Sequence, residues 1–376
     1  MDTFSFCPNP DCSLHVSAPH HDRWYHNHGS YLTLAFGVVP RFKCLWCGRT
    51  FSLQTFSTHY YAKKKVALAA LFERHAASQS GRAIGRALGL STGSVQNRLD
   101  RLARQALSLH ATLRPLAAPH EAVCVDGFVS FDVSQYFPNE LTFSITADSR
   151  FILELSHTSR RRSGTMTPLQ RQRARELYAR WKPQPGGIAH TFRDILDSLA
   201  AERPPSPSHP LVLITDDKPD YSRVLDRYPL FRSQDENHRV AHRTVNSKLP
   251  RTWLNPLFAS NYLDRELRKD QANHHRESTC FSRNVANSLS RLACYIAEHN
   301  YFKKFLIKGT VSDDRVHADV AGIPSHVRVS AMEGFFSDRA FLSRCRLSSP
   351  MRRIWKKADP TPGKLKAEYL PAFALS

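Results

Sequence analysis

Four cysteines near the start of the chain have the spacing of metal ligands. They form two close pairs, Cys7 with Cys12 and Cys44 with Cys47. Structural zinc sites use four soft ligands in tetrahedral geometry, so the two pairs predict one structural zinc ion and a zinc ribbon over residues 1–58. Histidines between the pairs are alternative ligands for one position: His15, His20, His21, His26 and His28. Four cysteines are the preferred set.

Two aspartates follow apolar segments that have the composition of buried strands. Asp126 follows residues 122–125, and Asp216 follows residues 211–215. Phosphodiester cleavage and strand transfer use two divalent ions about 3.5–4 Å apart. Mg²⁺ prefers oxygen ligands, which carboxylates supply. An aspartate at a strand end is often only a turn former or helix cap, but two of them in a basic chain indicate a magnesium site that acts on nucleic acid.

Residues 80–98 have the pattern of two helices joined by a tight turn. Gly89 permits the turn, Ser91 or Thr92 can cap the second helix, and Val95 fills the space between the helices. In a helix-turn-helix, the start of the second helix enters the major groove of DNA. The residues placed to contact bases or phosphates are Thr92, Ser94, Gln96, Asn97 and Arg98. A three-helix bundle without a ligand is the alternative.

The elements that must hold these side chains follow from the apolar pattern. Three helices are expected within residues 59–114, and the proline-bounded segment 115–119 is expected to be a linker. Strands are then expected at 122–126, 141–146, 151–155 and 211–215, with a helix at 192–201 before the last strand. This order predicts an RNase H-like α/β domain over residues 120–308. The expected fold class is multidomain: a small zinc ribbon, an all-α helix-turn-helix and this α/β domain.

The charge of the chain points to a polyanionic partner. It has 53 Lys and Arg against 33 Asp and Glu, a formal net charge of +20, and a pI near 9.9. Such an excess is typical of proteins that bind nucleic acid. Residues 309–376 contain basic and proline residues and are expected to be a partly ordered tail. No apolar run predicts a membrane span, and the N-terminus lacks the pattern of a signal peptide, so we expect a cytoplasmic location.

The chain resembles bacterial insertion-sequence DDE transposases that open with a zinc ribbon and a helix-turn-helix. The resemblance covers residues 7 to about 306 and rests on four segments: 125–138, 162–168, 215–221 and 261–283. It implies that Asp126 and Asp216 are the first two acids of a site for two catalytic Mg²⁺ ions. It further implies double-stranded DNA as partner, at element ends and target, and a homo-oligomeric synaptic complex in the bacterial cytoplasm, at the nucleoid when bound to DNA.

The third acid of the family is normally a glutamate on a helix, shortly after an asparagine. Here Asp264, three residues after Asn261, occupies that position. An ion pair between Asp264 and Arg268 at i+4 is the alternative. Other candidates for the third acid are Glu266, Glu277 and Glu298. Basic residues expected to hold phosphates beside the site are Lys218, Arg243, Lys248, Arg265 and Arg268.

Together these features predict a DNA transposase that binds the ends of a mobile element and catalyses Mg²⁺-dependent strand cleavage and strand transfer. Two other functions fit the same residues. One is a catalytically degenerate, transposase-derived regulator that only binds specific DNA. The other is a structure-selective nuclease that cleaves DNA without joining it.

Overall fold

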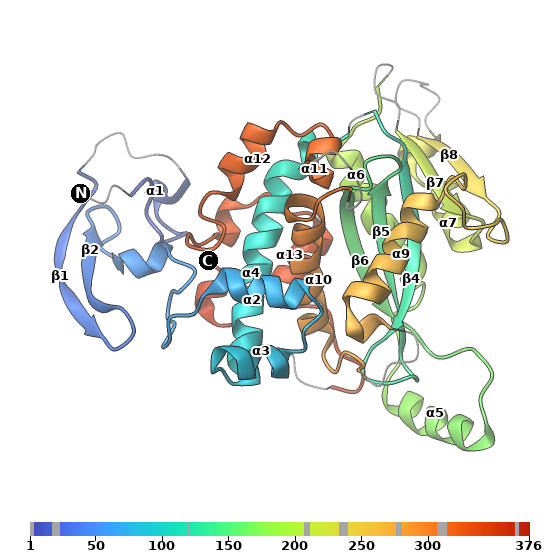
Figure 1. Cartoon of the computed structure of the whole chain (residues 1–376), viewed down its shortest axis with the longest axis horizontal. Coiled ribbons are helices and arrows are strands. Elements are labelled where there is room, and N and C mark those ends of the chain that lie inside the picture. Colours follow the sequence, from blue (N-terminus) through green and yellow to red (C-terminus); the bar gives the residue numbers. More distant parts are fainter. Residues whose placement is uncertain are drawn as a thin grey trace.

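The computed structural model describes residues 4–16, 23–118, 120–206, 211–232, 240–275, 280–306, 314–364 and 368–376. A small β module lies at one end of the molecule, a group of packed helices lies in the middle, and a larger sheet lies at the far end (Figure 1). The sheet and the helices around it form a mixed α/β core, as the apolar pattern predicts.

The N-terminal module is a three-stranded antiparallel sheet in the order β1-β2-β3. Its elements are α1 (Ser13–Val16), β1 (Tyr25–Thr33), β2 (Gly37–Cys44), β3 (Thr50–Ser52) and η1 (Leu53–Phe56). It has a core of its own, in which the cysteines pack with Leu14, Trp24 and Phe51. A module with so few apolar residues needs a further stabilising element, because domains this small rarely fold on a hydrophobic core alone.

The three predicted helices are α2 (Leu68–Ala76), α3 (Gly81–Leu88) and α4 (Thr92–Leu113). Ser80 caps α3, Ser91 caps α4, and Gly89 ends α3 with φ at +63°. A Cβ at Gly85 would lie 2.6 Å from the carbonyl oxygen of Leu90, so the turn can pass this point only over a glycine. The predicted helix-turn-helix geometry therefore has specific local causes.

The large sheet has the strand order β6-β5-β4-β7-β8. Strands β4 (Val123–Phe131), β5 (Pro138–Thr146) and β6 (Ile152–Ser159) are antiparallel neighbours, and β7 (Val212–Asp216) and β8 (Ala241–Val245) run parallel to β4. A parallel neighbour needs a crossover connection, and α6 lies between β6 and β7 in the chain. The helices of this part are α5 (Pro168–Arg180), α6 (Gly187–Glu202), α7 (Pro219–Leu225), α8 (Pro229–Arg232) and α9 (Phe258–Asp270).

The C-terminal residues that the structure describes are packed, although composition predicts a partly ordered tail over 309–376. They form α11 (His317–Val320), α12 (Ser325–Met332), η6 (Leu342–Arg344), α13 (Ser349–Trp355) and η7 (Ala372–Ala374). Trp355 is buried, and its indole N–H donates to the carbonyl oxygen of Ala374 at 2.6 Å. The apolar residues of α13 are buried by contacts with other segments of the chain. Local composition therefore does not predict their burial.

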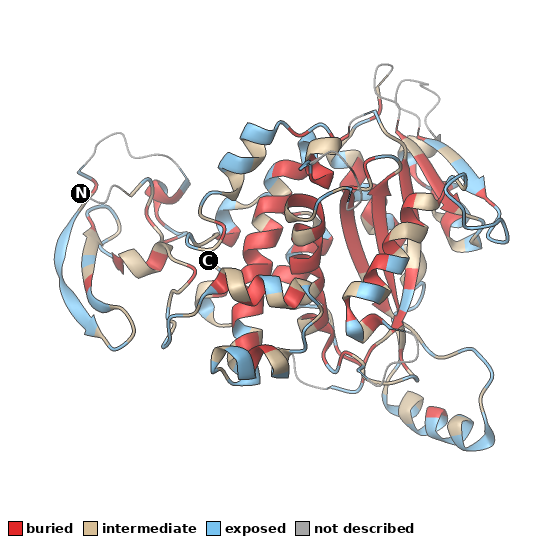
Figure 2. Cartoon of the chain, viewed as in Figure 1, coloured by how far each residue is buried: buried red, intermediate tan, exposed pale blue. Residues whose placement is uncertain are grey.

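Helices α4 and α10 (Val285–Ala297) lie side by side at the centre of the molecule and are largely buried (Figures 1 and 2). Beyond α10 the chain continues as a π-helical turn, η5 (Glu298–Phe302), and α10 is preceded by the short η4 (Ala272–His274). One hydrophobic core extends from Leu68 to Trp355. The segments predicted as separate domains, 59–114 and 120–308, thus share a core, and among the described residues the N-terminal β module has a core of its own.

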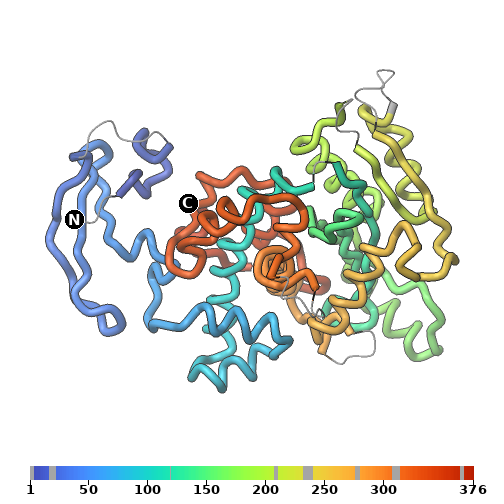
Figure 3. The backbone as a smooth tube through the Cα atoms, turned by 45° about the horizontal axis from the view of Figure 1, so that its top comes forward, coloured from blue at the N-terminus to red at the C-terminus, as the bar shows by residue number. Residues whose placement is uncertain are grey.

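The segment expected to be a linker is part of this core. Arg114–Leu116 forms a 3₁₀ turn, η2, directly after α4, and Arg114 is almost fully buried. The tube in Figure 3 shows the C-terminal segment running between the β module and the central helices. The backbone N–H of Thr58 donates to the carbonyl oxygen of Ser337 at 2.9 Å, so this segment also holds the β module to the body.

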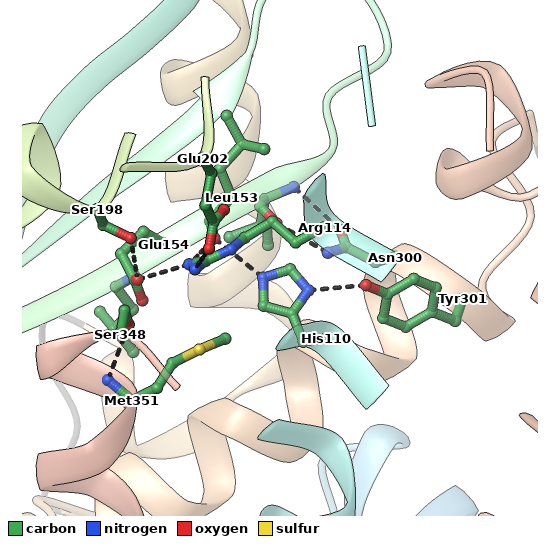
Figure 4. Close-up of polar contacts among 12 residues, drawn as sticks. His110, Arg114, Leu153, Glu154, Ser198, Glu202, Asn300, Tyr301, Ser348 and Met351 are labelled. Atoms are coloured by element: carbon green, nitrogen blue, oxygen red, sulfur yellow. Dashed lines mark hydrogen bonds and ion pairs between the residues drawn. The ribbon is translucent and has the colours of Figure 1, made fainter. Parts of the chain in front are cut away.

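A buried ionic network joins the end of α4 to the sheet and to α6 (Figure 4). Arg114 Nη1 lies 2.5 Å from Glu154 Oε2, and Nη2 pairs with Glu202. His110 Nε2 donates a hydrogen bond to the carbonyl oxygen of Leu153 at 3.0 Å. In a neutral imidazole the other nitrogen, Nδ1, carries no proton, so it accepts a hydrogen bond from the hydroxyl of Tyr301 at 2.7 Å. The network holds the end of α4 against the sheet and α6.

We expect Arg114→Met to destabilise the whole body of the protein. It keeps most of the side-chain volume but leaves Glu154 buried without its cation, which costs about 3–5 kcal/mol. Chemical denaturation followed by circular dichroism measures this loss. Arg173→Met is the matched control, because the pair of Arg173 with Glu176 lies on the surface and contributes little. Equal unfolding midpoints for the two variants would contradict the stabilising role of Arg114 as the cation paired with Glu154.

Candidate functional site

The four cysteines come together as the sequence predicts. Their sulfur atoms all lie within 4.8 Å of one another, and the Sγ atoms of Cys7 and Cys47 are 3.7 Å apart. Four thiolates bound to zinc at about 2.3 Å in a tetrahedron have sulfurs about 3.8 Å apart. The arrangement therefore fits a zinc ion: Cys7, Cys12, Cys44 and Cys47 could bind a structural zinc without rearrangement of the backbone.

The turn after β2 shapes half of this centre. The N–H of Gly48 donates to the carbonyl oxygen of Cys44 at 3.0 Å, and Gly48 has φ at +70°, a conformation that favours glycine. Burial raises the pKa of the Cys7 thiol. Burial also opposes ionisation of Cys47, but hydrogen bonds, first that of the Arg49 backbone, lower the pKa of Cys47 to about 7. Cys47 thus offers a thiolate near neutral pH, which is the form that binds metal.

The alternative histidine ligands do not reach the centre where they are described. His15 is fully buried, with Nδ1 2.7 Å from the carbonyl oxygen of Cys7 and Nε2 2.6 Å from the hydroxyl of Ser343. Both nitrogens of His15 are therefore occupied by other partners. His26 and His28 lie exposed on β1. His20 and His21 lie outside the described residues.

Asp126 and Asp216 lie side by side on neighbouring parallel strands. Val125 is in register with Thr215, so the next residue of each strand is one of the two acids. Residues in register point to the same face of a sheet. Asp126 does not end its strand as expected, because β4 continues to Phe131 along β5. Asp216 is the last residue of β7. The pair thus lies at the end of β7. Beyond this point β4 is no longer paired with β7.

The electrostatics of this pair favour a cation. Burial raises the pKa of Asp126, and the negative charge of Asp216 raises it further, while Lys218 opposes both effects. Burial likewise raises the pKa of Asp216. Two carboxylates that share a half-buried site repel each other, and a bound divalent cation removes that repulsion. The arrangement can therefore bind a hard cation or hold a proton.

Glu140 lies next to this site, on the face of the sheet that Gly127 shares, and the sequence did not single it out. It is fully buried on β5, with Oε1 2.9 Å from Lys218 Nζ and Oε2 2.6 Å from Arg160 Nη1. Burial opposes the charge of Lys218, but Glu140 raises the pKa of Lys218. A Cβ at Gly127 would lie 2.3 Å from Glu140 Oε1, so the glycine after Asp126 makes room for this carboxylate. A glutamate directly before the predicted strand 141–146 was the signal available.

The third predicted acid, Asp264, lies half-buried on α9, which packs against β4 and β5. Cys124 Sγ donates to the carbonyl oxygen of Pro256 just before α9, and Arg268 of α9 lies 4.5 Å over the ring of Phe128. Side chains alternate along a strand, so Asp126 faces α9 between these two contacts. Asp264 therefore lies on the helix that covers Asp126.

The three predicted acids do not form a ready-made metal cluster. Within the described part of the chain, the four cysteines are the only group of three or more metal-ligating side chains whose donor atoms gather. The alternative Glu266 pairs with Lys303 at 2.5 Å and Lys269 at 2.8 Å. Burial would raise its pKa, but the two lysines lower it. Burial raises the pKa of Glu298, in the same cluster, to about 7. Glu277 lies outside the described residues.

The predicted DNA-contacting residues of α4 divide into two groups. Thr92 and Asn97 are exposed and Ser94 is partly exposed near the start of the helix. Gln96 donates to Asp100 at 2.9 Å. Arg98 does not fit the predicted role, because it is 7% exposed and donates to Asn97 Oδ1 and to the carbonyl oxygen of Lys64. Arg98 therefore holds the segment before α2 rather than facing solvent.

The other predicted phosphate contacts differ in exposure. Arg243, Lys248 and Arg265 are exposed. Arg268 lies over Phe128 and donates to the carbonyl oxygen of His274 at 3.4 Å. Lys218 points toward Glu140, as described above, so its direct contact with a phosphate would compete with an ion pair.

Two comparisons of the sequence with known proteins gave no match. A scan against protein-family models finds no model that matches the chain, and a search of curated proteins finds no match. Among the described residues, no helix is both long enough and apolar enough to cross a membrane.

Proposed function

We propose that the protein is a DNA transposase of the DDE type, which binds the ends of a mobile element and catalyses Mg²⁺-dependent strand cleavage and strand transfer. The observation that carries the proposal is the pair of Asp126 and Asp216 on adjacent parallel strands, facing a helix that bears Asp264. The strand order, with three antiparallel strands followed by a helix and a parallel strand beside the first, supports an RNase H-like catalytic core.

The chemistry follows from this placement. Divalent ions would activate the attacking oxygen and stabilise the leaving oxygen of an in-line displacement at phosphorus. Asp126 and Asp216 would bind these ions, with Asp264 as the third ligand from α9. Lys218, held by Glu140, adds positive charge next to the pair and opposes the rise in pKa that burial causes in both acids. Water is the nucleophile for cleavage and a DNA 3′-hydroxyl for joining, so no covalent bond to the protein forms.

The N-terminal segments supply recognition in this proposal. The helix-turn-helix presents Thr92 and Ser94 at the start of α4, and the zinc ribbon is a second DNA-contacting module. The net charge of +20 supports binding to the phosphate backbone. Because two element ends must be held together for joining, we expect a homo-oligomer on DNA.

One observation favours a second candidate. Since the three acids do not gather within the described residues, the protein could be a DNA-binding regulator that lost catalysis. The two functions differ in one assay. Purified protein is incubated with supercoiled plasmid that carries the non-coding DNA on both sides of its gene, in Mg²⁺, Mn²⁺ or EDTA.

We expect metal-dependent nicks within the flanking DNA, followed by joined products, and neither in EDTA. Specific binding without nicks in Mg²⁺ and Mn²⁺ would favour the regulator. Cleavage without joining and without preference for the flanks would favour a structure-selective nuclease. Absence of DNA binding would contradict all three functions.

A further inference from the structure

A cleft of about 580 Å³ separates the helix-turn-helix from the segment that leads into α10. On one side it is lined by the start of α3 and the start of α4, and on the other by η4 and the start of α10. Its cationic side chains are Arg82, Arg283 and Arg291. Among the described residues that line it, none is an aspartate or a glutamate.

Three helix N-termini meet at this cleft. Ser80 caps α3 and Asn284 caps α10, and both line the cleft together with Thr92, the first residue of α4. A helix N-terminus carries a partial positive charge of about half an elementary unit and attracts anions. Three of them beside three arginines favour an anion in the cleft, although Glu368 Oε1 accepts a hydrogen bond from Asn284 Nδ2, next to the start of α10.

Arg291 is an independent sign of a missing anion. Its Nη2 donates to the hydroxyl of Ser282 at 2.9 Å, but its Nε is buried without a hydrogen-bond partner within the described part of the chain. Burial lowers the pKa of Arg291, and Asp100, whose charge opposes this, is itself bound by Lys357 at 2.7 Å. Arg291 as a whole is half-buried, and its buried Nε lacks a partner, so an anion that enters the cleft would satisfy this donor.

The cleft continues onto the surface that the helix-turn-helix offers to DNA. A neighbouring shallow hollow is lined by Arg86, Gly89 and Ser91, and it shares Arg82 and Thr92 with the cleft. Arg82 and Arg283 are exposed, and neither has an ion-pair partner among the described residues. Arginines therefore line both the hollow at the turn and the cleft, and they form a positively charged surface that suits the phosphates of DNA.

We propose that this cleft binds the phosphate backbone of the DNA that the helix-turn-helix contacts. The proposal rests on the DNA-binding part of the proposed function and goes further. One strand of the duplex passes from the turn at Gly89 across Arg82 to Arg291 and Arg283. Because η4 directly follows α9, which covers Asp126, the cleft leads bound DNA from the recognition helix toward the acids.

The test is the salt dependence of binding to fluorescein-labelled duplex DNA, measured by fluorescence anisotropy. Arg82→Gln and Arg283→Gln are compared with wild type and with Arg352→Gln, an exposed arginine of α13 that lines neither hollow. All three variants lose one charge, so the net charge is matched. Each cleft variant should reduce the slope of log K against log salt by about 0.9, and weaken binding roughly tenfold.

Arg352→Gln should bind as wild type does. Arg291→Gln should weaken binding further, and its thermal unfolding is measured to confirm that it is folded. Cleft variants that match Arg352→Gln in affinity and slope, while wild type binds DNA, would overturn this inference alone. Failure of wild type to bind any duplex would instead overturn the proposed function.

Discussion

Alanine at Asp126 or Asp216 should abolish metal-dependent cleavage and joining of DNA, by at least about a thousandfold. The physical reason is that the two carboxylates are neighbours on one face of the sheet, so either substitution removes half of the proposed ligand pair. Binding to DNA should persist, because the helix-turn-helix and the cleft lie elsewhere. Gel-based nicking and strand-transfer assays measure the first effect, and fluorescence anisotropy measures the second.

Asp217→Ala is the matched control. Asp217 is the next residue in the chain but is exposed, so its loss should leave catalysis intact. The Asp126→Ala and Asp216→Ala variants lose the repulsion between the two carboxylates. Without bound metal, each should therefore stay folded, with an unfolding midpoint no lower than that of wild type. Joining that persists in both alanine variants would remove the catalytic assignment.

Loss of zinc should unfold the N-terminal module and leave the body of the protein folded. The cysteines form the centre of a small separate core, whereas the body has one continuous core of its own. Binding of structural zinc is worth about 10–16 kcal/mol in zinc-finger peptides, far more than so small an apolar core can supply. We therefore expect Cys44→Ser to lose one equivalent of zinc and to become sensitive to protease over about residues 4–56.

Metal analysis and limited proteolysis measure this prediction, and Cys280→Ser is the control because Cys280 is exposed and distant in sequence from the four ligands. The fluorescence of Trp24, which stacks on Phe51 in the module core, reports the same transition. Zinc retained at full stoichiometry in Cys44→Ser would show that the ligand set is different.

Local sequence patterns were enough to predict the features that depend on neighbours in the chain. The spacing of the cysteines, the cap at Ser91 and the glycine turn at Gly89 all form as expected, because each depends on a few consecutive residues. The expected strands 141–146 and 151–155 also pair as β5 and β6, with a turn between them at Arg150, whose φ is +51°.

Features that depend on packing between distant segments were not predictable. The burial of Arg98 and Arg114 requires partners from other segments, whereas Arg98 was expected to face DNA. Glu140 contacts Lys218 only because β5, β4 and β7 are neighbours in the sheet. The C-terminal helices α12 and α13 pack against α4, α6 and α10, which are distant in sequence, so their own composition suggested a tail.

Binding of Mn²⁺, measured by electron paramagnetic resonance on the zinc-loaded protein, tests the central claim most directly. The account predicts that wild type and Asp217→Ala bind Mn²⁺ in competition with Mg²⁺, and that Asp126→Ala and Asp216→Ala lose this binding while retaining zinc. Mn²⁺ binding that is unchanged in Asp126→Ala and Asp216→Ala, or absent from wild type with DNA present, would contradict the assignment of these aspartates as the metal site.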